Sequence, residues 1–128
     1  VAIWAGVHIT NPRPSGVVAM APGSRGHLTI TAKDYLSSSV PTGPDSFSMA
    51  DLVSLLPRSM RVAIVRGASD GYGAGDRQIV AAGAGQVERF TIPFAGHSLK
   101  RILIARYVIE QAMDWVLAPN GAARAASN

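Results

Sequence analysis

Three short apolar runs alternate with helical patterns along this chain, and that alternation most narrowly limits what it can fold into. The runs span residues 16–21, 60–66 and 86–94. The first two are apolar at nearly every position, which is typical of strands buried on both faces, whereas the third alternates in part and favours a sheet edge. Helical patterns occupy residues 1–10, 49–56, 76–82 and 98–117. This order predicts an α/β fold in which helices flank a parallel sheet.

The predicted organisation is one unit over residues 1–118, with a short insertion at 24–58 and a flexible tail at 119–128. Three strands make a thin sheet with two edges that need cover, so we expect the unit to be part of a larger sheet. In the long C-terminal helix, Ser98 is the predicted N-cap. The side predicted to be buried comprises Leu99, Ile102, Leu103, Val108, Ile109, Ala112, Met113 and Val116.

Composition excludes several classes of function. Hydrophobic residues make up 48% of the 128 residues and charged residues 16%, as expected of a globular domain. The longest apolar stretch, residues 99–117, is interrupted by charges, so no membrane span is predicted. The arginines are scattered singly from Arg13 to Arg124, and we interpret them as surface charge rather than a nucleic-acid interface. Without cysteine or histidines at ligand spacing, the sequence predicts neither a metal site nor another cofactor, and it indicates no compartment.

Polar residues suited to catalysis follow each predicted strand. Asp70 follows the second strand, His97 follows the third, and His27 follows the first on the same side. Because parallel strands bring their carboxyl ends to one edge, His97 is the candidate general base and Asp70 the carboxylate that orients it. Asp76 is the alternative acid, although its position suits a helix N-cap. His27 is a candidate for contacting substrate, whereas His8 is predicted to be a surface residue of the first helix.

Two segments resemble the last two strands of the α/β-hydrolase superfamily: residues 62–70 (VAIVRGASD) and 91–98 (TIPFAGHS). In that family the triad acid follows the penultimate strand and the histidine follows the final one, after the nucleophile in chain order. Residues 16–23 (GVVAMAPG) resemble the strand after the nucleophile helix, and residues 1–10 that helix. The resemblance implies the C-terminal half of a serine hydrolase acting on carboxylic esters, or on thioesters or amides. Residues 24–58 then stand where the family inserts its cap.

The chain departs from the family in one respect. Its one Gly-x-Ser-x-Gly, residues 67–71 (GASDG), contains Asp70 and follows the strand after which the family has its acid rather than its nucleophile. Ser24 has the wrong spacing and follows the wrong strand. We therefore expect the nucleophile to lie shortly before Val1. We also expect the isolated chain to be inactive. Its expected partners are the missing N-terminal half of the same domain and a small-molecule ester substrate.

Two other interpretations stay open. One is a non-catalytic α/β binding module or a degenerate hydrolase relative, which would use the same fold for binding alone. The other is a small flavodoxin-like domain that is complete in itself. A nucleotide-binding loop at residues 71–75 (GYGAG) is disfavoured, because such a loop opens the first strand–helix unit rather than a late one.

Overall fold

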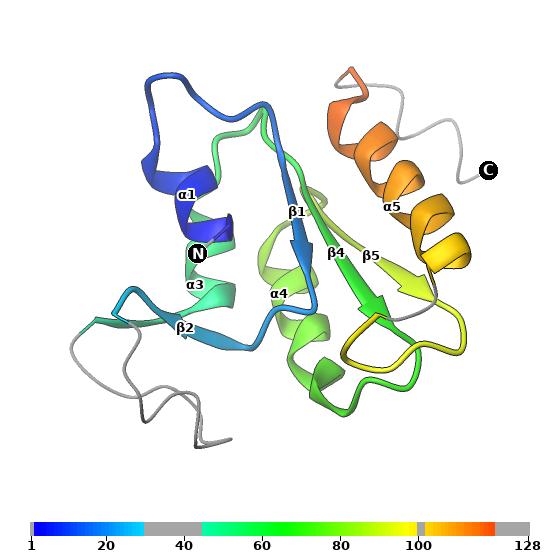
Figure 1. The fold of residues 1–128 in the computed structure, drawn as a ribbon. Coiled ribbons are helices and arrows are strands. Elements are labelled where there is room, and N and C mark those ends of the chain that lie inside the picture. The colour runs from blue at the N-terminus through cyan, green and yellow to red at the C-terminus, as the bar shows by residue number, and fades with distance from the viewer. Residues whose placement is uncertain (1, 30–44, 100–101, 120–128) are drawn as a thin grey trace.

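The computed structural model describes residues 2–29, 45–99 and 102–119. Helix α1 (Ala2–His8) leads to strand β1 (Val17–Met20), and the chain then forms the short strands β2 (Arg25–His27) and β3 (Ser46–Ser48) before helix α3 (Met49–Ser54). Strand β4 (Val62–Gly67), a 3₁₀ turn η1 (Gly71–Gly75) and helix α4 (Asp76–Ala82) follow. Strand β5 (Val87–Ile92) and helix α5 (Ile102–Leu117) complete the described chain (Figure 1).

The main sheet has the strand order β1-β4-β5, and both strand pairs are parallel. Val62 at the start of β4 pairs with Val17 of β1 on one side and with Val87 of β5 on the other. The predicted α/β class with a parallel sheet is therefore confirmed, and β5 lies at the predicted edge of this sheet.

Strand β1 differs from its prediction as a strand buried on both faces. It forms the other edge of the three-stranded sheet, and within the described ranges no strand pairs with its outer side. Met20 at its carboxyl end is 53% exposed, although Val17 and Ala19 are buried. Val18, on the opposite face from Val17 and Ala19, is partly buried and packs with the α5 layer, so both faces of β1 are covered except at Met20.

Helices cover both faces of the sheet (Figure 1). On one face, α1, α3 and α4 pack against side chains that include Val62 and Ile64 of β4. On the other face, α5 packs against Ala63 and Val65 of the same strand. All six residues of β4 are buried, as expected of a central parallel strand between two helical layers.

Helix α5 begins later than predicted, and two residues of its predicted buried side face outward. It starts at Ile102, and Ser98 lies in a turn before it, so the prediction of Ser98 as N-cap is wrong. Leu103 is 85% exposed and Met113 is 48% exposed, although both were predicted to be buried. Val108, Ala112 and Val116 are buried as predicted, and Ala105, which was not predicted, is buried with them. The small side chains of the two alanines let the helix approach the strands closely.

The insertion at 24–58 is more regular than predicted. Its strands β2 and β3 pair antiparallel, with Arg25 opposite Ser48, and Ser48 caps α3 as predicted by accepting a hydrogen bond from the Asp51 backbone amide at 3.4 Å. Residues 30–44 of the insertion and residues 120–128 of the predicted tail lie outside the described residues. Within the described ranges, no helix combines the length and the apolar character needed to cross a membrane.

Replacing Ile64 by alanine tests the placement of the core. Ile64 is fully buried between the helical layers, so Ile64→Ala is expected to lower the free energy of unfolding by about 2–5 kcal/mol. The matched control is Leu103→Ala on the outer side of α5, which is expected to change it by no more than about 0.5 kcal/mol. Urea denaturation measures both. A larger loss of stability from Leu103→Ala than from Ile64→Ala would instead support the predicted burial of Leu103.

Candidate active site

The loops that follow β4 and β5 meet at the carboxyl edge of the sheet, because the two strands run parallel and in register. The structure brings together the two residues predicted from these loops. The His97 Nδ1 atom lies 3.1 Å from Oδ2 of Asp70, across 27 positions of sequence. This contact is the observation on which the candidate site stands.

Gly67 allows the two loops to approach each other. The Ala68 and Ser69 backbone amides donate hydrogen bonds to the carbonyls of Ile92 and Ala95, at 3.0 and 2.9 Å. A Cβ atom at position 67 would overlap the carbonyl oxygens of Ala95 and Gly96. Only glycine therefore fits at the end of β4 while the loop that carries His97 keeps this position.

The Asp70 carboxylate is enclosed by hydrogen-bond donors, and its side chain has no exposed surface. Its Oδ1 accepts from the Tyr72 backbone amide at 3.0 Å, and its Oδ2 accepts from Arg66 Nη1 at 2.6 Å as well as contacting His97. Burial acts to raise the pKa of Asp70, but the hydrogen bonds from Tyr72, Arg66 and His97 outweigh it and hold that pKa below its ordinary value. Asp70 is therefore ionised near neutral pH.

His97 is oriented by this carboxylate. An ionised carboxylate only accepts hydrogen bonds, so Nδ1 of the neutral ring carries the proton and donates a hydrogen bond to Asp70. Nε2 is then left with its lone pair, as a general base requires. The side chain of His97 is 58% exposed, and its ring lies 5.1 Å from the Tyr72 ring at an angle of 59°. The pair thus combines a buried acid with an accessible imidazole.

Arg66 and Asp76 correct two predictions. Arg66 was interpreted as surface charge, but it is fully buried, and Arg61 is only 7% exposed. Asp76 was interpreted as a helix N-cap; instead it begins α4, is 1% exposed and accepts from Arg66 Nε and Nη2 at 2.6 and 2.8 Å. Arg89 Nε lies 3.4 Å from the same carboxylate. One sequence signal of this cluster was missed: Arg66 lies near the end of an otherwise apolar strand, and aspartates follow it four and ten positions later.

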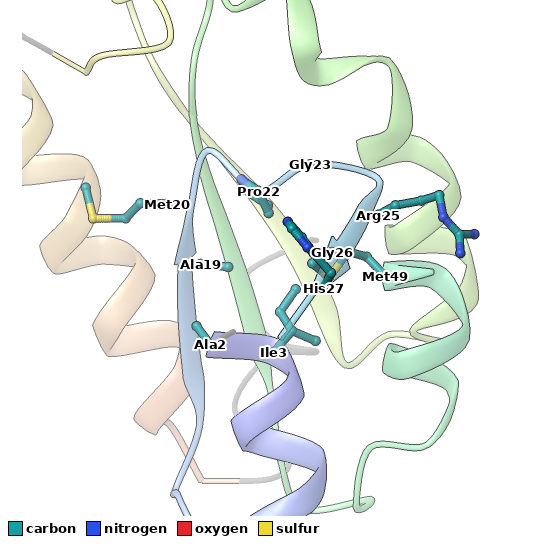
Figure 2. Close-up of a pocket in the computed structure, with 10 residues that line it drawn as sticks. All are labelled: Ala2, Ile3, Ala19, Met20, Pro22, Gly23, Arg25, Gly26, His27 and Met49. Carbon is teal, nitrogen blue, oxygen red and sulfur yellow. The ribbon is translucent and has the colours of Figure 1, made fainter. Parts of the chain in front are cut away.

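His27 lies in β2 and lines a cavity of about 380 Å³ that is separate from the acid–histidine pair. In Figure 2 it lies between Ile3 of α1 and the turn at Pro22 and Gly23. The cavity lining joins the start of α1, the end of β1 and the two short strands: Ala2, Ile3, Ala19, Met20, Pro22, Gly23, Arg25, Gly26, His27 and Met49. Neither Asp70 nor His97 belongs to this lining, so the substrate contact of His27 stays a prediction.

His8 lies at the surface, as predicted. Its ring stacks on Trp4 with centroids 4.3 Å apart, and its Nδ1 lies 3.0 Å from the Trp4 carbonyl oxygen. No carboxylate takes part in these contacts, in contrast to those of His97. Among the described residues, no three His, Cys, Asp or Glu side chains are grouped so that they could hold a metal ion.

The chain matches no protein-family model, no curated protein and no solved structure. A functional assignment therefore depends on the residues of the chain itself and on their geometry.

The depressed pKa of Asp70 predicts a dependence of stability on pH. A carboxylate whose pKa is lower in the folded state contributes stability above the unfolded value, about 3.9, and this contribution is lost as pH falls through the folded value. Wild-type protein should thus lose stability steeply below about pH 4. Asp70→Asn should be less stable at neutral pH and should depend less on pH in that range. The exposed control Asp114→Asn should follow wild type. Urea denaturation at several pH values tests this, and identical acid profiles for Asp70→Asn and wild type would contradict it.

Gly67→Ala should separate the two loops. Because the new methyl group would meet backbone atoms rather than a flexible side chain, unfolding should become easier by at least about 1–3 kcal/mol, and the His97 ring should lose its contact with Tyr72. Gly71→Ala is the matched control, since a Cβ there meets open space. Denaturation and ring-to-ring nuclear Overhauser effects measure both results. Equal stability of the two variants, with the His97–Tyr72 contact retained, would refute the role given to Gly67.

Proposed function

We propose that this chain supplies the acid and the histidine of an α/β-hydrolase triad that hydrolyses carboxylic esters, or thioesters or amides. The observation that carries the proposal is the contact between Nδ1 of His97 and the buried Asp70 carboxylate at the carboxyl edge of a parallel sheet. The order of acid and histidine along the chain agrees with that family. The likeness of residues 62–70 and 91–98 to its last two strands supports the same assignment.

The proposed reaction has two steps. In each step, His97 first accepts one proton and then donates one. First, Nε2 takes the proton of a serine hydroxyl as that oxygen attacks the ester carbonyl, and it returns a proton to the alcohol that leaves. Next, Nε2 takes a proton from water as the water attacks the acyl-serine. It then gives a proton back to the serine oxygen as the carboxylic acid departs. Throughout, the Asp70 carboxylate stabilises the imidazolium form of His97.

The nucleophile of this reaction is proposed to precede Val1. In the family it sits on a sharp turn between a strand and the helix that follows. Ala2 and Ile3 at the start of α1 line the same cavity as Met20 and Pro22 at the carboxyl end of β1. A turn just before α1 would therefore lie at the same edge as His97. The outer side of β1, which no described strand pairs with, leaves room for the strand that this turn requires.

The cavity between α1, β1 and β2 is the proposed substrate pocket. Its volume of about 380 Å³ falls in the range typical of small-molecule sites. Buried apolar residues line it, among them Ile3, Ala19 and Met49, while the His27 imidazole contributes a polar group. Such a lining suits a small ester with an apolar acyl group.

A binding module without catalysis is the second candidate. It is favoured by one observation: the one Gly-x-Ser-x-Gly of the 128 residues, at 67–71, contains Asp70 and stands where the family has its acid rather than its nucleophile. Such a module would use the same cavity for a ligand that is not turned over. The two candidates differ in whether a nucleophile exists beside His97.

The coding sequence upstream of Val1 distinguishes them. A Gly-x-Ser-x-Gly is expected within about five residues before Val1. The protein that includes those residues should be labelled covalently by a fluorophosphonate, which reacts with an activated serine.

Two controls accompany the labelling. The 128-residue chain alone should not react, and Ser24→Ala in the longer protein should react as wild type does. A frame with no Ser, Cys or Asp at the expected place, or labelling that depends on Ser24, would overturn the proposal.

A further inference from the structure

The buried guanidinium of Arg66 donates hydrogen bonds to three different residues. Its guanidinium donates to Asp70 through Nη1, to Asp76 through Nε and Nη2, and to the Pro22 carbonyl through Nη2. These partners belong to three different segments: the turn after β1, the loop after β4 and the start of α4. One buried side chain thus ties together the loops at the carboxyl edge of the sheet.

The geometry divides these contacts unequally between the two carboxylates. Asp76 receives the two-pronged contact, with 2.6 and 2.8 Å to its two oxygens, and this parallel arrangement fixes the plane of the guanidinium. Asp70 receives a single N–H at 2.6 Å. Asp76 is therefore the anchor that orients Arg66, and the remaining N–H is aimed at Asp70.

The charges support the same division. Arg66 carries one positive charge against the two negative charges of Asp70 and Asp76, and the half-exposed Arg89 adds a contact to Asp76 only. Two guanidinium groups thus contact Asp76. Asp70 shares one of them, and its Oδ2 also contacts His97. The carboxylate that faces the imidazole therefore receives less compensating positive charge than Asp76 does.

We infer that Arg66, anchored by Asp76, is a positioning residue that holds the Asp70 carboxylate against His97 and the Pro22 turn against the cavity. Its role in catalysis rests on the proposed function, because it presupposes that His97 acts as a base. The positioning itself needs no nucleophile and can be measured in the 128-residue chain. Failure of this inference and failure of the proposed function are therefore distinguishable.

Arg66→Lys is the main test. Lysine keeps the charge but lacks the planar fork, so it cannot hold Asp76, Asp70 and the Pro22 carbonyl at once. The Nδ1–H proton of His97 should then exchange with water about tenfold faster or more, because its hydrogen bond to a charged acceptor is weakened. Proton NMR of the imidazole N–H measures this rate, and ring nitrogen shifts report whether Nδ1 still carries the proton.

Arg61→Lys is the matched control. Arg61 is also buried, but it lies at the opposite end of β4, where it donates to the carbonyls of Trp115 and Pro119. Its replacement should destabilise the fold while leaving exchange of the His97 proton as in wild type. Because the two lysine variants make the same chemical change, a general loss of stability would affect both alike.

Asp76→Asn provides a second variant if Arg66→Lys does not fold. It has the same shape as the native side chain but breaks the two-pronged contact, and it should also speed exchange of the His97 proton about tenfold. Faster exchange in a folded variant at position 66 or 76, with Arg61→Lys unchanged, is the expected result. Wild-type exchange in folded Arg66→Lys or Asp76→Asn would overturn the inference, as would equally fast exchange in Arg61→Lys.

Discussion

Burying a guanidinium costs free energy unless hydrogen bonds and opposite charges compensate for it. The buried guanidinium of Arg66 has such partners, and these contacts organise the carboxyl edge of the sheet. Burial acts to lower the pKa of Arg66, but its hydrogen bonds to Asp76 and Asp70 outweigh burial and raise it, so the side chain remains charged. Each partner is itself tied to another segment: Asp70 contacts His97 after β5, and Asp76 begins α4. The positions of the acid, the histidine and the turn beside the cavity therefore depend on one ionic cluster.

The parallel sheet makes this cluster possible. Three strands that run in one direction bring three loops to one edge, and two helical layers seal the strands below it. Gly67 lets two of those loops touch, and Arg66, one position before it, joins the third through the Pro22 carbonyl. The last two residues of β4 thus connect the central strand of the fold to every candidate functional residue except His27.

How much of this could be predicted from sequence varied with the range of the interactions. The apolar runs and their alternation with helical patterns predicted the parallel sheet. The rule that parallel strands end at one edge predicted the pairing of Asp70 with His97. The burial of Arg66 was missed because it depends on aspartates that only the folded chain brings within reach. The outward turn of Leu103 was missed because Ala105, a weak signal in an apolar pattern, takes the place on the sheet that the prediction gave to a larger side chain. The cavity that His27 lines could not be predicted, because His27 lies in β2, whose pairing with β3 outside the main sheet the apolar pattern does not indicate.

Ester turnover by the protein that includes the residues before Val1 tests the central claim most directly. With p-nitrophenyl acetate as substrate, His97→Ala should reduce turnover to the rate in buffer, and Asp70→Asn should lower kcat on the order of 10⁴-fold, as loss of the orienting carboxylate does in serine proteases. The exposed control His8→Ala should retain most of the activity. Turnover in His97→Ala close to that of wild type would contradict the assignment of His97 as the base.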